Sequence, residues 1–381
     1  MRKAATFGRL AIASGAVAVL ALGTVVAPAG AQPTGGFTVI VSGLDNPRDL
    51  DFSPNGQLYV AEAGHGGSPA DCVPGGPEGD ICPGFTSAIS VINTAAGEAH
   101  QVVSGLASVA GQGGFAATGV DGISFLGSGT LYGIMALASD VVPPGAFSPD
   151  LEAGLKAQLG RLIKATPSGN WKAVADVGHT DFAWSAEHVD LAPGDFPDAN
   201  PYAVLALPGS QWVMDAGANT IDRVLPNGTV SVEAFVPNPP NGDAVPTCVD
   251  QGPDGALYIS ELTAASNGPG DARVWRFAPG DSAPTVWATG LTAVTGCGFG
   301  ADGQFYAVEF STLGLAGGAP GTGAVVQVPA HSTSPTTVAA GLSFPGGFAA
   351  APDGSLYVSN WSIAPADTGG GPTGQVVRIV P

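Results

Sequence analysis

Acidic and amide side chains recur at the ends of short apolar segments, and such oxygen ligands suit a hard cation or a polar ligand. Five of them close the most regular segments: Glu62, Asp215, Glu261, Glu309 and Asn360. A second group opens segments of the chain: Asn46, Arg48, Asp49, Asp121, Asn200, Thr247 and Thr295. If the two groups meet, they form a ring of oxygen atoms, for which calcium is the expected cation. The alternative is that the carboxylates bond to local backbone groups or pair with Arg48 and Arg223.

The five histidines are scattered, without the spacing of a zinc site. His65 follows Glu62 closely and His188 follows Glu187, so either histidine can be considered as a general base. The simpler interpretation is that both are ordinary loop histidines. The chain has no Gly-x-Ser-x-Gly nucleophile elbow and no phosphate-binding glycine-rich loop ending in lysine.

A short unit returns six times along the chain: Pro54–Glu62, Ser128–Gly133, Pro208–Asp215, Asp254–Glu261, Asp302–Glu309 and Asp353–Asn360. Asp-Gly or Asn-Gly supplies the positive φ angles of a tight hairpin turn. The aromatic and β-branched residues that follow form a well-buried strand. The second copy is degenerate, but it keeps the turn and the Leu-Tyr pair.

The six copies predict an all-β fold, a six-bladed β-propeller of four-stranded antiparallel blades. Two further strand-like segments follow each copy, for example Ile89–Ile92 and Gln101–Val103. The last copy supplies only three strands, ending at Gln375–Val380. The orphan segment Phe37–Val41, the first strand of the mature chain, is expected to complete that blade and to cover its edge. A β-sandwich or a parallel β-helix would not explain this match between the two ends.

Loop length distinguishes the two faces of the predicted disc. The hairpin turns are short, whereas the other face carries Ala63–Ser87, Ala136–Gly160 with a short helix near Leu151–Leu159, and Asp176–Asn200. Long loops on a rigid scaffold are where binding usually occurs. The residues expected on this ligand-binding face are Asn46, Arg48, Asp49, Glu62, His65, Asp121, Asn200, Asp215, Glu261, Glu309 and Asn360.

The N-terminus has the features of a secretory signal peptide. Arg2, Lys3 and Arg9 precede the apolar stretch Leu10–Ala27, and Ala29-Gly30-Ala31 offers a cleavage site. We therefore expect residues 1–31 to be the signal peptide and residues 32–381 to form a single propeller domain. A membrane anchor is the alternative. Secretion, or another extracytoplasmic location, is predicted, with no membrane association after cleavage.

The net charge and the cysteine content limit the classes of binding partner and the cellular compartment that we expect. The chain has 31 acidic and 12 basic residues, which argues against a nucleic-acid partner. Its four cysteines suit an oxidising compartment. Cys72 and Cys82 share one loop, while Cys248 and Cys297 occupy nearly matching places in successive repeats. We predict these two pairs among the three possible connectivities.

Several motifs together resemble the ScyD/ScyE family: Gly43–Arg48, Leu58–Gly64, the cysteine loop, Asp198–Tyr202 and Asp243–Thr247. The resemblance covers the mature chain and implies an NHL-like propeller, in a family named from scytonemin-pigment gene clusters whose biochemical activity is not established. Asp49 stands where the family typically has glycine, and the second repeat is degraded.

More distantly, the chain is similar to the SMP-30/gluconolactonase propellers, calcium-dependent hydrolases with Glu, Asn, Asn and Asp ligands. This similarity implies Asn46, Asp121 and Asn200 as metal ligands, whereas later repeats offer Thr247, Thr295 and Pro345. The leading expectation is a propeller that binds a small molecule or an exported protein on its long-loop face. A calcium-dependent lactonase or esterase is the alternative, so whether the protein is an enzyme stays open.

Overall fold

The computed structural model describes residues 36–75, 79–166, 168–366, 371 and 373–381. The predicted signal peptide, residues 1–31, lies outside the described residues. No helix in the described part of the chain is long and apolar enough to cross a membrane.

Six sheets form the molecule, and each is an antiparallel blade. The first blade contains β2 (Pro47–Phe52), β3 (Leu58–Glu62), β5 (Asp80–Asn93) and β6 (Glu98–Gly111), with the short β4 (Val73–Pro74) added beside β5. The second contains β7 (Val120–Leu126), β8 (Thr130–Met135), β9 (Arg161–Ala165) and β10 (Trp171–Asp176). The third contains β11 (Pro201–Leu207), β12 (Ser210–Asp215), β13 (Thr220–Val224) and β14 (Val230–Phe235).

The remaining three blades follow the same order. The fourth contains β15 (Pro246–Gln251), β16 (Leu257–Glu261), β17 (Ala272–Phe277) and β18 (Thr285–Leu291). The fifth contains β19 (Val294–Phe299), β20 (Phe305–Glu309), β21 (Gly323–Val328) and β22 (Thr336–Leu342). The sixth contains β23 (Phe348–Ala350), β24 (Leu356–Asn360), β25 (Gly374–Ile379) and β1 (Phe37–Leu44). The predicted six-bladed β-propeller is therefore confirmed.

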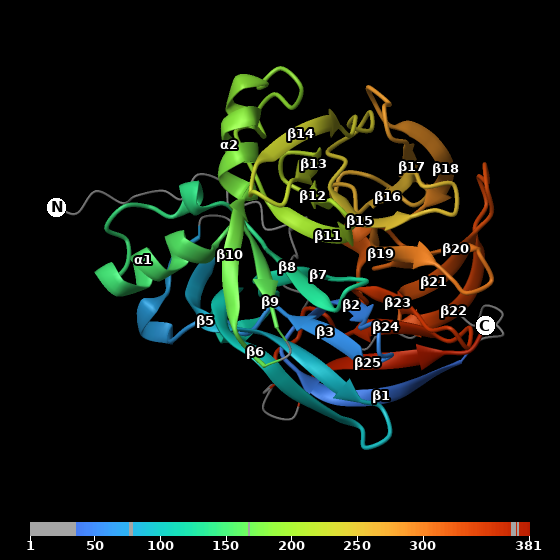
Figure 1. Cartoon of the computed structure of the whole chain (residues 1–381), viewed down its shortest axis with the longest axis horizontal. Coiled ribbons are helices and arrows are strands. Elements are labelled where there is room, and N and C mark those ends of the chain that lie inside the picture. Colours follow the sequence, from blue (N-terminus) through green and yellow to red (C-terminus); the bar gives the residue numbers. More distant parts are fainter. Residues whose placement is uncertain (1–35, 76–78, 167, 367–370, 372) are drawn as a thin grey trace.

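The innermost strands β2, β7, β11, β15, β19 and β23 contact one another in a closed ring around the centre of the disc (Figure 1). The predicted closure is also confirmed, because β1 pairs with β25 along a register that starts at Phe37 opposite Ile379. A strand from one end of the chain thus covers the edge left by the other end, so the sheet edge is paired.

The connections differ between the two faces as expected, and two of the long ones contain helices. Helix α1 (Pro149–Gln158) is the predicted short helix, with Ser148 accepting a hydrogen bond at its N-terminus from the Leu151 N–H. Helix α2 (Val177–Glu187) lies in the connection from β10 to β11, which the sequence had suggested only as a loop. Its apolar residues do not form a stripe along one face of the helix, so the hydrophobic periodicity of the sequence did not predict it.

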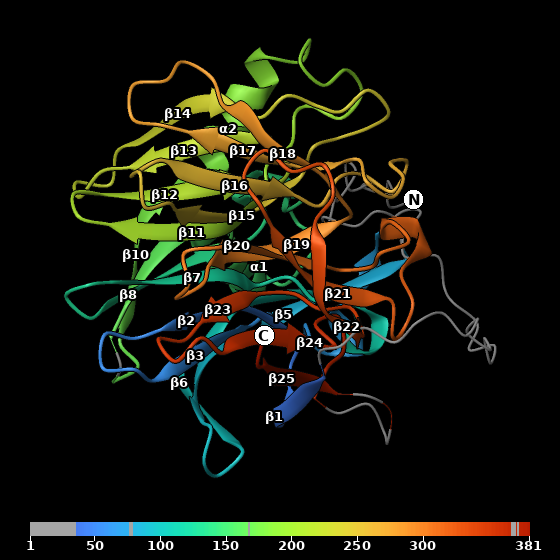
Figure 2. The same cartoon turned by 90° about the vertical axis from the view of Figure 1, so that its right-hand side faces the viewer.

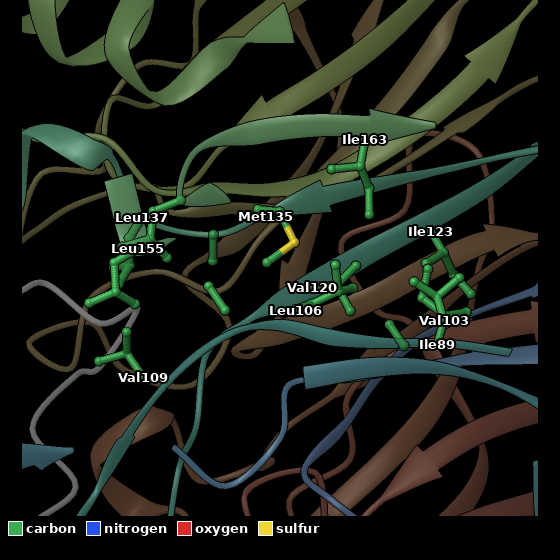
Figure 3. Close-up of a cluster of buried hydrophobic side chains, with 14 of the residues drawn as sticks. Ile89, Val103, Leu106, Val109, Val120, Ile123, Met135, Leu137, Leu155 and Ile163 are labelled. Carbon is green, nitrogen blue, oxygen red and sulfur yellow. The ribbon is translucent and has the colours of Figure 1, made fainter. Parts of the chain in front are cut away.

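Apolar side chains fill the space between blades. The largest cluster joins the first two blades to α1, with Ile89 and Val103 beside Ile123 and with Leu155 from the helix (Figure 3). Both predicted disulfides are present, Cys72–Cys82 and Cys248–Cys297. The second one joins the innermost strands of the fourth and fifth blades.

Candidate functional site

The innermost strands carry a repeated irregularity near their starts. In five blades the pairing register shifts there, as between Val120 and Gly122 or between Val294 and Gly296. The residues inside these bulges are Arg48 with Asp49, Asp121, Tyr202, Thr247 and Thr295. A bulge re-aims a side chain away from the regular alternation of a strand. The bulges therefore explain why a polar residue from each of these five blades lies at the centre of the ring.

Five of these residues, Asp49, Asp121, Tyr202, Thr247 and Thr295, line a small pocket at the centre of the ring, with a cavity volume of about 30 Å³. Its walls are formed by Asp49, Asp121, Tyr202, Ala203, Val204, Thr247, Cys248, Val249, Thr295, Gly296, Cys297 and Gly347. All six blades contribute, so the pocket exists only once the ring is closed. We take it as the candidate binding site, because a concave pocket with a few convergent polar groups is the usual form of such a site.

Small residues next to the bulges let neighbouring strands approach closely. A Cβ atom on Gly122 would lie 2.6 Å from the carbonyl oxygen of Tyr202, and one on Gly347 would lie 2.4 Å from the Cα of Asp49. Asp49 is the exception at the corresponding position of the first blade. Its carboxylate therefore enters the pocket where the other blades have Gly, Ala or Cys.

Asp49 is held by two backbone donors, the N–H of Leu50 at 2.9 Å and that of Ile123 at 3.1 Å. Surrounding protein removes most of its hydration, which raises the pKa of Asp49 to about 8. The nearby carboxylates of Asp51 and Asp250 add to this increase. Asp49 therefore gives up its proton at a higher pH than an ordinary aspartate does.

Arg48 lies beside two of the lining residues, Asp121 and Tyr202, without lining the pocket itself. The Nε atom of Arg48 lies 3.7 Å from Asp121 Oδ1 and has no hydrogen-bond partner of its own among the described residues. Burial raises the pKa of Asp121, while the Arg48 charge opposes that rise. Burial also raises the pKa of Tyr202 to about 12, so its hydroxyl stays protonated. The pocket thus presents donors and acceptors together.

The acidic strand ends satisfy groups within the blades. Glu62, Asp215 and Glu309 accept hydrogen bonds from the backbone N–H groups of Asp45, Asn200 and Thr292, each 2.7–2.8 Å long. Asn360 accepts one from Ser343 in the same way. Glu261 instead pairs with Arg273 and accepts a bond from Trp275. None of the five strand ends lines the pocket.

The three residues implied as metal ligands are not brought together at the pocket wall. Asp121 lines the pocket, but Asn46 and Asn200 do not. The Asn46 amide donates to the carbonyls of Gly64 and Gly114, and the amide oxygen of Asn200 accepts from Leu137 N–H. Across the described residues, no three histidine, cysteine or acidic side chains are grouped so that they could hold a metal ion.

His65 lies on the long-loop face, away from the pocket lining. Its Nδ1 atom is 2.9 Å from Asp45 Oδ2, and about half of its side chain is exposed. A second pair, His179 with Asp140, has the same form and a similar distance of 3.0 Å. His188 stacks on Trp184 instead.

Sequence reasoning did not single out Tyr202 or the disulfide Cys248–Cys297 as parts of the site. A usable signal exists for Tyr202, because it stands one residue after the start of its strand, as Asp121, Thr247 and Thr295 do. The bulges that turn these residues inward arise from strand pairing, which a single sequence does not display.

The chain matches no family model and no curated protein sequence. Solved structures with the same fold include a glucose-dehydrogenase-type oxidoreductase of Thermus thermophilus, with 15% identity and a TM-score of 0.55, over 91% of this chain and 99% of that one. The PQQ-bound aldose sugar dehydrogenase of Streptomyces coelicolor has 13% identity and a TM-score of 0.53, over 92% and 100% of the two chains. A gluconolactonase of Xanthomonas campestris has 9% identity and a TM-score of 0.51, over 92% and 90%. At such identities the likeness shows the propeller fold alone.

Proposed function

We propose that this protein binds a small polar molecule in the central pocket. The bulged residues that line the pocket support the proposal: they bring together a phenol, two threonine hydroxyls and two carboxyl groups. Such a mixture of donors and acceptors suits one hydroxylated end of a polyhydroxylated molecule better than a single ion. The acidic strand ends, which are used inside the blades, supply no separate catalytic set.

Binding of glucose, gluconate and glucono-1,5-lactone should be measured by calorimetry on the mature protein. Tyr202→Phe removes one hydroxyl from the pocket and should weaken binding of a recognised compound by about 0.5–1.5 kcal/mol, roughly 2–10-fold. Tyr132→Phe, on β8 and outside the pocket lining, is the matched control and should bind as the parent does. If no compound in the panel binds, or if both variants weaken binding equally, the pocket does not recognise polyhydroxylated ligands.

A calcium-dependent lactonase or esterase is the second candidate, and two acidic groups in the pocket favour it. Asp49 and Asp121 both have raised pKa values and line the same pocket, an arrangement found in many active sites. Calorimetric titration with calcium and a hydrolysis assay on glucono-1,5-lactone test this candidate. No calcium binding at millimolar concentration, together with no turnover, would remove it.

We also propose that the protein is exported through residues 1–31, in keeping with the ScyD/ScyE-like motifs of the mature chain. Its two disulfides fit an oxidising compartment. Mass spectrometry of the exported protein should find Gln32 as the first residue. A product that retains residues 1–31 would contradict cleavage at this site.

A further inference from the structure

Three carboxylates are enclosed between helix α2 and the third blade. Asp181 comes from α2, Asp215 from the end of β12 and Asp222 from β13, and none of them is exposed. Figures 1 and 2 show α2 lying beside β13 and β14. Within the described chain, no lysine, arginine or histidine lies at salt-bridge distance from any of the three. Three buried charges without compensation would cost about several kcal/mol each.

The hydrogen bonds leave a defined set of oxygens without partners. Asp215 Oδ1 accepts from the N–H groups of Asn200, Gly217 and Ala218, at 2.7–2.8 Å. Asp222 Oδ2 accepts from the Thr220 hydroxyl at 2.9 Å. Four oxygens remain among the described residues of this cluster: Asp215 Oδ2, Asp222 Oδ1 and both of Asp181.

The unpartnered oxygens belong to side chains that contact one another. Asp181 is within hydrogen-bond reach of both Asp215 and Asp222. A hydrogen bond between two carboxyl groups requires a proton on one of them. Two contacts therefore require two protons, and two protons satisfy all four oxygens.

We propose that Asp181 and Asp222 are carboxylic acids in the folded protein and that their two protons hold helix α2 on the third blade. The Asp222 hydroxyl donates to Asp181, and the Asp181 hydroxyl donates to the Asp215 carboxylate. The one remaining negative charge then rests on Asp215, where three backbone N–H groups stabilise it.

The electrostatic surroundings favour these protons. Burial raises the pKa of Asp181 and of Asp222 well above the usual range, and the charge of Asp215 raises both further. The elements that contact α2 carry these charged groups: Glu233 on β14, Asp140 on η4 (Ser139–Val141), and Arg161 and Lys164 on β9. Arg161 pairs with Asp176 at 2.5 Å and His179 pairs with Asp140, while Glu233 raises the pKa of Asp222.

Alkaline pH should therefore release α2. The folded state holds protons that the unfolded or undocked state gives up, so the contact is complete in acid and weakens as pH rises through the raised pKa values. Because α2 belongs to the β10–β11 connection, its release would change the long-loop face of the propeller.

Hydrogen exchange of the α2 amides, residues 177–187, from pH 5 to pH 10 tests the proposal after correction for intrinsic exchange. In the parent protein, protection should fall with rising pH, by up to about tenfold per pH unit for each retained proton, and should level off above the raised pKa values. The double variant Asp181→Asn with Asp222→Asn supplies amide donors that need no added proton, so its protection should change less than about twofold. Asp140→Asn removes a carboxylate facing α2 from outside and should keep the parent's pH dependence.

Two results would overturn the proposal. One is a double variant whose α2 protection falls with pH as steeply as in the parent. The other is protection of parent α2 at neutral pH that appears only with added calcium and disappears on chelation, because a cation would then occupy the cluster. If the double variant does not fold, the infrared difference spectrum between the parent and Asp181→Asn tests whether the carboxyl groups are protonated. A protonated carboxyl band at neutral pH must be present in the parent and reduced in the variant, and its absence refutes the proposal.

Discussion

The Asp49 carboxylate accepts a hydrogen bond from the backbone N–H of Ile123 at 3.1 Å, which joins the innermost strands of the first and second blades. Asp51 accepts in the same way from Phe125 at 2.6 Å. Asp250 repeats the arrangement between the fourth and fifth blades, through Phe299 at 2.8 Å. Carboxyl groups on the ring therefore stabilise contacts between blades as well as shaping the pocket.

Replacing Asp49 with asparagine should lower the free energy of unfolding by about 1–3 kcal/mol, because one backbone N–H would face an amide donor. It should also flatten the pH dependence of stability. Burial raises the pKa of Asp49 to about 8 and that of Asp51 to about 7, from 3.8. The folded state therefore binds more protons than the unfolded state does. Stability is lost as pH rises from the ordinary pKa of 3.8 toward the raised values of about 7 and about 8.

Urea unfolding at pH 5, 7 and 9 measures both effects. Asp71→Asn, at an exposed site, is the control and should follow the parent at each pH. An Asp49→Asn variant whose stability falls with pH as steeply as the parent's would contradict the assigned titration.

Loss of the Cys248–Cys297 disulfide should lower the free energy of unfolding by about 2–4 kcal/mol. The bond spans 49 residues and joins two blades, so the unfolded chain gains considerable freedom without it. The double serine variant should be compared in urea with the matched Cys72→Ser, Cys82→Ser variant. That bond spans only 10 residues, so its loss should cost less. Equal losses would show that the inter-blade bond has no special role.

Closure of the ring by β1 predicts different effects for two valines on one strand. Val41 is buried opposite Val376, whereas Val39 is 44% exposed. Val41→Ala should cost about 1–2 kcal/mol of stability through the methyl groups lost from the core. Val39→Ala should change stability by less than about 0.5 kcal/mol. Thermal and urea unfolding of both variants provide the measurement, and the reverse order would place the wrong face of β1 inside.

Arg273 should matter far more than Arg276, although both form ion pairs. Glu261, the partner of Arg273, has a fully buried side chain, whereas the Arg276–Asp254 pair is exposed to solvent. Arg273→Met should therefore cost about 3–5 kcal/mol at neutral pH, and less near pH 5 as Glu261 takes up a proton. Arg276→Met should cost about 0–1 kcal/mol. Similar losses in urea for the two variants would contradict the burial difference.

Much of the fold could be predicted because its information is local. Asp-Gly turns followed by Leu-Tyr-Val strands mark each blade, and the missing fourth strand at the C-terminus matched the orphan strand at Phe37. The disulfide pairs followed from the same repeat, since Cys248 and Cys297 occupy neighbouring strands. Helix α2 was not predicted, because contacts with other elements stabilise it and its sequence has no apolar stripe.

The sequence by itself determined the number of blades, the closing strand and the two faces of the disc, because turn chemistry and strand periodicity act over a few residues. Only the tertiary structure decided which side chains share the axis. The strand-end acids looked suited to a ligand, but backbone N–H groups from the preceding loops satisfy them. Bulges turned Tyr202 and the threonines inward instead, and α2 placed Asp181 against two carboxyls distant in sequence. Such contacts depend on register and burial, which are set only when the ring closes.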